Sequence, residues 1–314
     1  MSESGNCAKP DFFIVGQPKA GTSALFSFLK QHPDVCMCAT KEPQFFCHDI
    51  QSQFFKLNGW ERSLKNYLEL YTHCEGAKAT GEASTAYLYS RVAADEIQKF
   101  NPEAKVIALF REPVEFLRTY HLQILRTSYP IEDESDFLRA LELEPRRKMG
   151  LSTPKDCLDP QFLYYSERVR YAEQWQRFIS AFPAENLKLI LYDDFKLNNR
   201  AVYLDVLDFL ELKRVDEPEY KIINPKVKVR FRRAKQTTDR LLFPLKRRFK
   251  ARMPDQLFHL LRSMYRSVYF NKTPVDELSA DSVLLLKKRF RNDVESFGDL
   301  IDRDLLTEWD YLDL

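Results

Sequence analysis

The stretch that most constrains the fold is residues 11–23, DFFIVGQPKAGTS, because it joins an apolar run to a glycine-bounded turn. The run at 12–15 has the length of a buried strand, and apolar residues recur at helical spacing beyond Gly21. This order predicts a strand, a tight turn and the N-terminus of a helix. Because the first amides of a helix have no acceptor inside it and carry the positive end of its dipole, such a turn is typical of an anion site, most often for phosphate.

The turn differs from the loop of nucleotide triphosphatases, whose pattern is GxxxxGK[ST]. Its two glycines have that separation, but Thr22 occupies the position of the lysine, and the loop's own lysine, Lys19, lies inside it. A later apolar strand at 105–110 ends in Arg111, where a triphosphatase usually has the aspartate that holds Mg²⁺. We therefore expect a phosphate site that works without metal. A P-loop kinase with an aberrant loop is the less favoured alternative.

Apolar runs of strand length alternate with amphipathic helical segments through most of the chain. This alternation predicts an α/β fold: a single P-loop-like domain with a central, mostly parallel sheet flanked by helices, and a helical C-terminal region. Ligands of such sheets bind at the carboxyl ends of the strands, so four polar residues that follow predicted strands or extended segments are expected at one rim. They are Lys19, Glu42, Glu82 and Arg111.

Two motifs resemble those of sulfotransferases that use 3′-phosphoadenosine 5′-phosphosulfate (PAPS). Residues 16–23, GQPKAGTS, are similar to the loop that binds the 5′-phosphosulfate in that family. The tripeptide Arg111-Glu-Pro113, followed by Thr119, is similar to the family's 3′-phosphate motif, although family members commonly have serine at the position of Thr119.

Three further segments continue the resemblance in the same order, so that it spans nearly the whole chain. Residues 41–46, KEPQFF, resemble a segment of the heparan-sulfate and related carbohydrate sulfotransferases, and residues 81–84 with Tyr87 resemble their E-K-[ST]-x-x-Y segment. Residues 304–309, DLLTEW, resemble the family's closing turn. One departure lies at 166–168, SER, where the family commonly has a G-x-Y turn that contacts adenosine.

The resemblance assigns roles to particular residues. The 5′-phosphate would be held by Lys19, Ala20, Gly21, Thr22 and Ser23, with Lys19 also following the charge onto the bridging oxygen. Glu42 would be the general base, because a nearby lysine and apolar neighbours are surroundings that tune a carboxylate for that work, and Glu82 is its rival.

The 3′-phosphate would be bound by Arg111 and Thr119, and a late loop that closes over the same phosphate is expected where a basic run begins. The candidates there are Lys226, Lys228 and Arg230, and the sequence does not choose among them.

Composition, together with the resemblance, predicts an organisation of the chain: a flexible N-terminus at 1–10 and a sulfotransferase domain over 11–314. Within that domain, the polar stretch 127–160 is expected to be a variable loop excursion, and 226–270 a basic helical region.

Charge and composition add little to the choice of partner. The formal net charge is only +2, so no nucleic-acid partner is expected, although residues 226–252 contain twelve lysines or arginines and one acid. That run is either a solvated face or a surface for an anionic acceptor or membrane headgroups.

Location is predicted from the absence of long apolar stretches and from the cysteines. No apolar stretch approaches the roughly 20 residues of a bilayer span, and the N-terminus is polar rather than signal-like. The six cysteines, without a tight framework, predict mostly reduced thiols in a cytoplasmic protein. The alternative is a soluble luminal domain of an anchored enzyme, in which some cysteines could pair.

Together these features predict a PAPS-dependent sulfotransferase. It would move a sulfuryl group to a hydroxyl or amine of an acceptor, a saccharide, glycolipid or other small metabolite, by metal-independent in-line transfer. The alternative from another class is a non-catalytic nucleotide-binding or scaffold protein that uses its basic surface for a partner.

Overall fold

The computed structural model of the chain describes residues 9–50, 61–127, 131–155, 157–215, 218–219, 228–229, 238, 263–265, 267–271, 278–312 and 314. They group into two compact units, which are described separately. The first comprises 1–116, 170–223 and 290–313, and the second 117–169 and 224–289 with residue 314. The single domain predicted over 11–314 stays a prediction.

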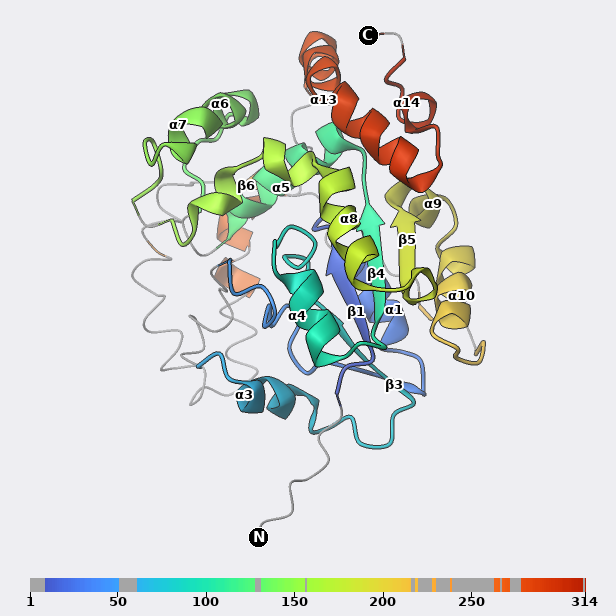
Figure 1. Ribbon diagram of the computed structural model, residues 1–314. Coiled ribbons are helices and arrows are strands. Elements are labelled where there is room, and N and C mark those ends of the chain that lie inside the picture. The colour runs from blue at the N-terminus through green and yellow to red at the C-terminus, as the bar shows by residue number, and fades with distance from the viewer. Residues whose placement is uncertain are drawn as a thin grey trace. The chain divides into compact units, whose positions relative to one another are not determined.

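A five-stranded sheet forms the centre of the first unit, in the order β2-β3-β1-β4-β5, and every neighbouring pair is parallel (Figure 1). The strands are β1 (Phe12–Gly16), β2 (Val35–Met37), β3 (Ala79–Ala83), β4 (Lys105–Phe110) and β5 (Leu187–Leu191). Burial explains why β1 and β4 appear in the sequence as nearly continuous apolar runs, whereas β3, ATGEA, is buried although it contains Thr80 and Glu82. The predicted α/β class with a parallel sheet is confirmed.

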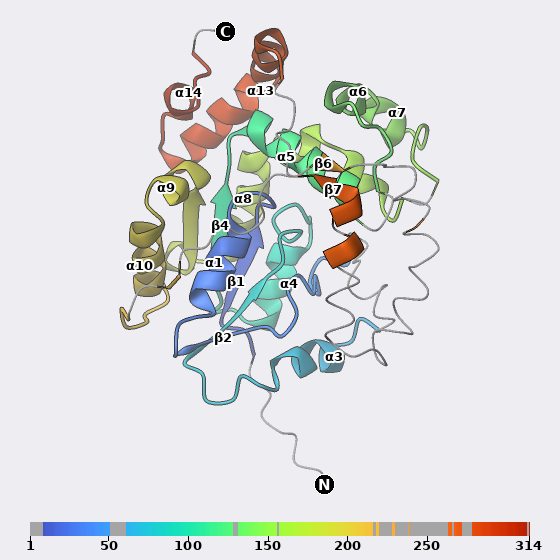
Figure 2. The same ribbon diagram turned by 180° about the vertical axis from the view of Figure 1, so that it is seen from behind.

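Helices cover both faces of this sheet. In Figure 1 the helices α4 (Ala93–Phe100) and α8 (Tyr171–Ala181) lie in front of it, and Figure 2 shows α1 (Thr22–Leu29) and α10 (Asn199–Phe209) on the opposite face. The aromatic ring of Phe110, at the end of β4, packs against Tyr171 and Trp175 of α8, with centroids 5.3 and 6.1 Å away. Burial of such rings is the main favourable contribution to holding a helix on a sheet.

Glycine is required at one position inside the sheet. A Cβ atom at Gly81 of β3 would lie 2.1 Å from the ring of Phe12, whose strand β1 is the neighbour of β3. The absent side chain allows that ring to pack flat across β3. Any side chain at residue 81 would displace that ring.

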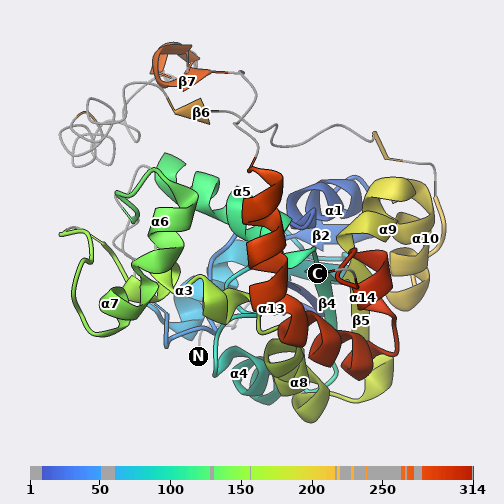
Figure 3. The same ribbon diagram turned by 90° about the horizontal axis from the view of Figure 1, so that it is seen from above.

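The C-terminal elements return to the carboxyl end of the sheet. Helix α13 (Ala280–Ile301) is followed by α14 (Leu305–Glu308), which Figure 3 shows beside α9 (Tyr192–Leu197). Arg303 forms an ion pair with Asp194 of α9 at 2.6 Å, and the indole of Trp309 donates to Asp193 at 3.0 Å. These bonds give the DLLTEW segment a structural role in the first unit.

Among the described cysteines, one pair forms a disulfide and three, Cys38, Cys47 and Cys157, are free thiols, so most are reduced as predicted and the pair is the exception. Cys36 of β2 and Cys74 form a disulfide with their Cα atoms 5.4 Å apart. The bond ties the edge strand β2 to the segment after the short helix η1 (Glu69–Tyr71). Their separation of 38 residues gives no local signal, so only the folded chain brings the two sulfurs together.

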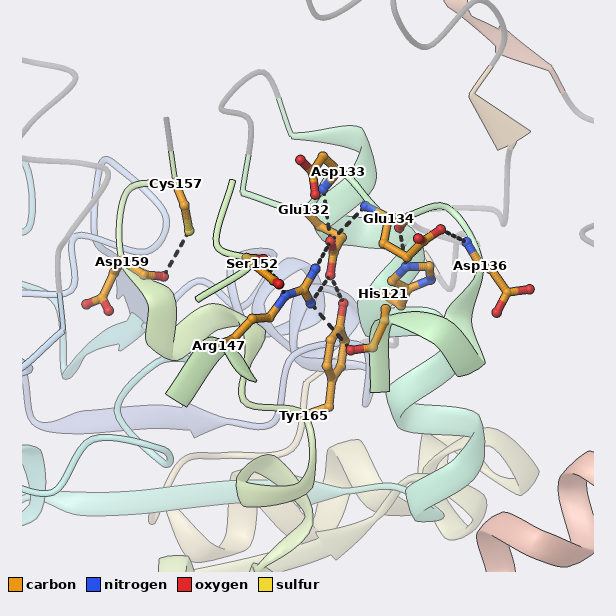
Figure 4. A network of polar contacts seen from close by, with 11 residues as sticks. His121, Glu132, Asp133, Glu134, Asp136, Arg147, Ser152, Cys157, Asp159 and Tyr165 are labelled. Carbon is orange, nitrogen blue, oxygen red and sulfur yellow. Dashed lines mark hydrogen bonds and ion pairs between the residues drawn. The ribbon is translucent and has the colours of Figure 1, made fainter. Parts of the chain in front are cut away.

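In the second unit, the stretch predicted as a loop excursion contains helices α6 (Phe137–Glu142) and α7 (Glu144–Lys148) and a buried ion pair. The guanidinium of Arg147 lies 2.6 Å from the carboxylate of Glu132, and both side chains are fully buried. Figure 4 shows the two groups facing each other. The hydroxyl of Tyr165 donates to the same carboxylate at 2.7 Å. A loop prediction based on polar composition was therefore wrong here, because these polar residues satisfy one another internally.

The other elements of the second unit are one longer helix and several short pieces. The helix α5 (Pro113–Arg126) begins in the first unit and continues here, and η2 (Pro160–Leu163) and η3 (Ser166–Val169) follow α7. A two-stranded antiparallel pair joins β6 (Lys228–Val229) to β7 (Phe270–Asn271).

Candidate active site at the carboxyl ends of the strands

The turn between β1 and α1 has the open amides that its sequence predicts. Ala24 and Leu25 are the first residues of the helix to donate, both to the Gly21 carbonyl at 2.8 and 3.1 Å. Within the described part of the chain, the amides of Gly21, Thr22 and Ser23 have no acceptor. They lie at the positive end of α1, which is an arrangement suited to a bound anion.

Glycine is obligatory at the end of this turn. Gly21 has φ of 94°, in the left-handed region, and a Cβ atom there would lie 2.8 Å from the ring of Phe195. Lys19, two residues earlier, also has a left-handed φ of 66°. Ala20, between them, is fully buried, so its contribution to an anion site comes from the backbone.

Arg111 lies directly against this turn. Its guanidinium donates to the Lys19 carbonyl at 3.0 Å, and its amide donates to the Gln17 side chain at 3.3 Å. The structure therefore brings Lys19 and Arg111 to one rim, as expected from their places after β1 and β4.

The Arg111 side chain is held on its other sides as well. It stacks 4.5 Å from the centroid of the Tyr192 ring and pairs with Glu115 at 3.1 Å, and only 12% of the side chain is exposed. A cation fixed in this way is preorganised for a ligand phosphate, because little side-chain entropy is left to lose.

Glu112 explains the centre of the Arg-Glu-Pro tripeptide. Its carboxylate accepts from the amides of Val114 at 3.0 Å and Glu115 at 2.7 Å, so it caps the start of α5, and Pro113 occupies the first turn, where no amide is needed. The hydroxyl of Tyr311 donates to the same carboxylate at 2.5 Å. Burial and this carboxylate raise the pKa of Tyr311, so its hydroxyl stays a donor.

Glu42 follows β2 on a loop at the same edge of the sheet. Its amide donates to the carbonyl of Ala83, at the end of β3, at 3.0 Å, and its φ of 59° turns the chain there. The carboxylate is about one-third exposed and lies 3.6 Å from the ammonium of Lys41. It is therefore accessible to an acceptor molecule.

Two sequence motifs combine to hold this loop. The amide of Gln44 donates to the hydroxyl of Ser84 at 2.9 Å, and the amides of Phe45 and Phe46 donate to the hydroxyl of Tyr87 at 2.9 and 3.3 Å. The spacing of serine and tyrosine after β3 thus supplies acceptors for the backbone of the KEPQFF loop. Without them, these buried amides would be left unpaired at a cost of about 1–3 kcal/mol each.

Glu82, the rival base, has a different environment. It is fully buried in β3, and its carboxylate accepts from Ser84 at 2.6 Å, from Tyr71 at 3.1 Å and from Tyr67. Burial raises the pKa of this carboxyl, and the surrounding hydroxyls oppose part of that rise. A carboxylate without exposure and with this many donors is suited to bracing the core rather than to meeting a substrate.

The remaining predicted binding residues belong to the second unit. Thr119 lies on α5 and is only 4% exposed. Lys226 and Arg230 lie outside the described residues, as does the side chain of Lys228, whose backbone forms part of β6. Their roles stay predictions.

The Ser-Glu-Arg segment that replaces the G-x-Y turn forms the short helix η3 and is held within the second unit. Ser166 donates to Glu144 from its amide at 2.9 Å and from its hydroxyl at 2.5 Å. The guanidinium of Arg168 lies 4.5 Å from the centroid of the Tyr120 ring.

Two contacts of the site were missed in reading the sequence. The lysine beside the predicted base was noted, but not the bond from its ammonium to the hydroxyl of Ser23. The other missed contact is that of Tyr311, which completes the cap of α5. Nothing local links residue 41 to residue 23 or residue 311 to residue 112.

Comparison with known proteins identifies the family. Residues 9–238 match the family described as sulfotransferase domain. The chain belongs to the sulfotransferase family.

Three relatives show how far the likeness of this sulfotransferase extends. The membrane-associated sulfotransferase kil1 of Dictyostelium discoideum is 25% identical over 68% of this chain and 58% of its own length. Carbohydrate sulfotransferase 15 of Mus musculus is 25% identical over 67% and 45%, and heparan sulfate glucosamine 3-O-sulfotransferase 6 of Homo sapiens is 27% identical over 82% and 69%. The matched part of the chain thus spans about half the length of the first two relatives.

A solved structure confirms the fold. A sulfotransferase from Alicyclobacillus acidocaldarius superposes with a TM-score of 0.69, at 24% identity, over 96% of this chain and 99% of that one. In the part of this chain that the structure describes, no helix is both long and apolar enough to cross a bilayer.

Proposed function

We propose that this sulfotransferase transfers the sulfuryl group of PAPS to a hydroxyl or amine of a saccharide, glycolipid or other small acceptor. The observation that carries the proposal is the bond from the Arg111 guanidinium to the Lys19 carbonyl, 3.0 Å long. It joins the open amides of the phosphate loop to a cation that can bind a second phosphate. One small molecule with two separate anionic groups can then span both.

The donor atoms of the site fit such a nucleotide. The amides of Gly21, Thr22 and Ser23 are directed out of the first turn of α1. Among the described residues, no group of three or more metal-ligating side chains lies there. Lys19 and these amides hold the 5′-phosphate. Arg111 holds the 3′-phosphate. The contacts predicted for Thr119 and for a basic residue at 226–230 stay predictions from the sequence.

PAPS supplies a sulfuryl group whose transfer leaves additional negative charge on the 5′-phosphate. Lys19 and the amides of the phosphate loop stabilise that charge, because fixed donors at a helix terminus need no reorganisation when it develops. This replaces the function that Mg²⁺ has in phosphoryl transfer. The sequence of the loop, with its displaced lysine and an arginine after β4, supports transfer without metal.

Glu42 takes the proton of the acceptor in this proposal. Its carboxylate is exposed enough to meet an acceptor and is linked to the phosphate loop through Lys41 and Ser23. Glu82 lacks that access, since it is fully buried among hydroxyl donors. We therefore assign the base to Glu42 and a structural role to Glu82.

Calorimetric titration tests the class of ligand. 3′-Phosphoadenosine 5′-phosphate should bind with the same affinity with and without Mg²⁺, and ADP should bind far more weakly because it lacks the 3′-phosphate. Binding of ADP or ATP that requires Mg²⁺, with no binding of the 3′-phosphorylated nucleotide, would contradict the proposal. An acceptor screen with labelled PAPS then identifies the substrate.

Turnover of the Lys19→Ala variant tests the transfer step. One preorganised charge stabiliser is typically worth about 10²–10³-fold in turnover, so a loss of that size is expected. Equal turnover of the variant and the wild type would remove Lys19 from the mechanism.

The disulfide bears on where the protein folds. We propose that the chain matures in an oxidising compartment, because structural disulfides persist there. This favours the luminal location over the cytoplasmic one. Peptide mass analysis without reduction should recover Cys36 joined to Cys74 from the native source. Recovery of both as free thiols would favour the cytoplasm.

A further inference from the structure

The ammonium of Lys41 bridges two segments that are far apart in the sequence. Lys41 precedes Glu42 on the loop after β2, and its ammonium lies 3.6 Å from the Glu42 carboxylate. It also donates to the hydroxyl of Ser23, in the first turn of α1. One side chain thus connects the carboxylate assigned as base to the loop assigned to the 5′-phosphate.

The backbone of this loop is fixed, whereas the Glu42 carboxylate is not held by it. Bonds from the loop to Ala83, Ser84 and Tyr87 set the path of residues 42–46. The carboxylate, however, stands at the end of a side chain with several rotatable bonds. Within the described part of the chain, Lys41 is the sole ion-pair partner of that carboxylate.

The pair is about one-third exposed, and it differs from an isolated surface ion pair because the lysine also contacts Ser23. The Lys41 and Glu42 side chains are 31% and 34% exposed, and the lysine has a second acceptor in Ser23. One of the three donors of the ammonium goes to Ser23, and the Glu42 carboxylate lies at ion-pair distance. An exposed ion pair contributes only about 0–1 kcal/mol to the free energy of unfolding. We therefore look for the effect of Lys41 on the position of the Glu42 carboxylate rather than on stability.

We propose that Lys41 is a positioning residue that holds the Glu42 carboxylate beside the phosphate loop before the acceptor binds. The inference deepens the proposed sulfuryl transfer and rests on it. By fixing the carboxylate relative to α1, Lys41 reduces the orientational freedom that must be lost when base, acceptor and donor align. Misplacement of a reacting group by about 1 Å can cost on the order of 10²-fold in rate.

Kinetics of four variants test this role. Lys41→Met should lower kcat about 10- to 100-fold while KM for PAPS and affinity for 3′-phosphoadenosine 5′-phosphate change less than about threefold. Lys41→Arg, which keeps a cation with several donors, should recover most of the lost kcat. If Lys41 acts through Glu42, the double variant Lys41→Met/Glu42→Gln should be no slower than Glu42→Gln alone.

Lys78 provides the matched control. It also pairs with an acid, Asp34 at 2.8 Å, but it precedes β3 and so lies at the opposite end of that strand from the rim. Lys78→Met should leave kcat unchanged, which separates a local role of Lys41 from a general effect of removing a paired lysine.

The outcomes distinguish the inference from the function on which it rests. Wild-type kcat in Lys41→Met, with wild-type transfer established, would overturn the role of Lys41 and leave the sulfotransferase proposal standing. A further loss in the Glu42→Gln background would mean that Lys41 acts without Glu42, which also overturns positioning. Absence of nucleotide binding and transfer in the wild type would overturn both.

Discussion

Two glutamates near the carboxyl ends of neighbouring strands have opposite environments. Glu42, after β2, is one-third exposed and faces a lysine. Glu82, in β3, is fully buried and faces hydroxyl groups. The same side chain is thus available for proton transfer in one place and braces the core in the other. Because β2 and β3 are neighbouring strands, the two glutamates lie in the same part of the sheet. They differ in their exposure to solvent and in the charge of the groups that contact them.

The most direct test of the different roles of Glu42 and Glu82 is to replace each carboxylate by an amide in turn, beginning with Glu42. Glu42→Gln should lower turnover by about 10²–10⁴-fold, because general-base catalysis typically contributes that much, and should leave nucleotide binding intact. Steady-state kinetics and calorimetry measure the two quantities. Full activity would transfer the role of base to another residue, with Glu82 next in line.

Removing the disulfide should have the second largest effect, and it should act on the Glu42 side of the comparison. Cys36→Ser/Cys74→Ser should lower the free energy of unfolding by about 2–4 kcal/mol, because the open chain regains the entropy that the bond removes. Since β2 leads into the Glu42 loop, turnover should fall in parallel. Cys157→Ser, at a cysteine outside the disulfide, is the control. Denaturation with unchanged midpoints would contradict a stabilising role.

Tyr87 connects the two regions, so its hydroxyl sharpens the comparison at a smaller scale. Tyr87→Phe leaves the amides of Phe45 and Phe46 without their acceptor and should cost about 1–3 kcal/mol of stability. Chemical denaturation measures that loss. Because this hydroxyl holds the loop of Glu42, turnover should fall several-fold even at temperatures where the variant is folded. A variant that is less stable but has wild-type turnover at temperatures where it is folded would show that Tyr87 supports the core and not the Glu42 loop.

Glu82→Gln should have the smallest effect at neutral pH, about 1 kcal/mol on stability and little on turnover per folded molecule. Its pH dependence is more informative. Burial raises the pKa of Glu82 above the ordinary value of 4.5, so the folded state binds more protons than the unfolded state above that pH. Stability should therefore fall as pH rises from about 4.5 through the raised pKa. In Glu82→Gln, the free energy of unfolding should fall less steeply with pH over this range. An unchanged pH dependence would contradict a raised pKa for Glu82.

Much of the fold and the phosphate loop could be predicted because their signals are local. The apolar run at β1, the left-handed Gly21 and the arginine after β4 each follow from a few neighbouring residues. Parallel strands then bring the ends of β1 and β4 together without further information. For the same reason Lys19 and Arg111 could be expected on one rim.

The features that were missed all join distant residues. The Cys36–Cys74 bond, the contact of Lys41 with Ser23 and the cap supplied by Tyr311 depend on pairings set only by the folded chain. The Glu132–Arg147 pair was missed for a related reason, because two charges in a polar stretch give no sign that they will be buried against each other.

The bond from Tyr311 to Glu112 has a consequence for the order in which the protein becomes functional. The helix that begins beside Arg111 gains its complete cap only when a residue 199 positions later has been synthesised and has folded back. A nascent chain can form the sheet early, but the cap of the helix that follows Arg111 stays incomplete until residue 311 has left the ribosome.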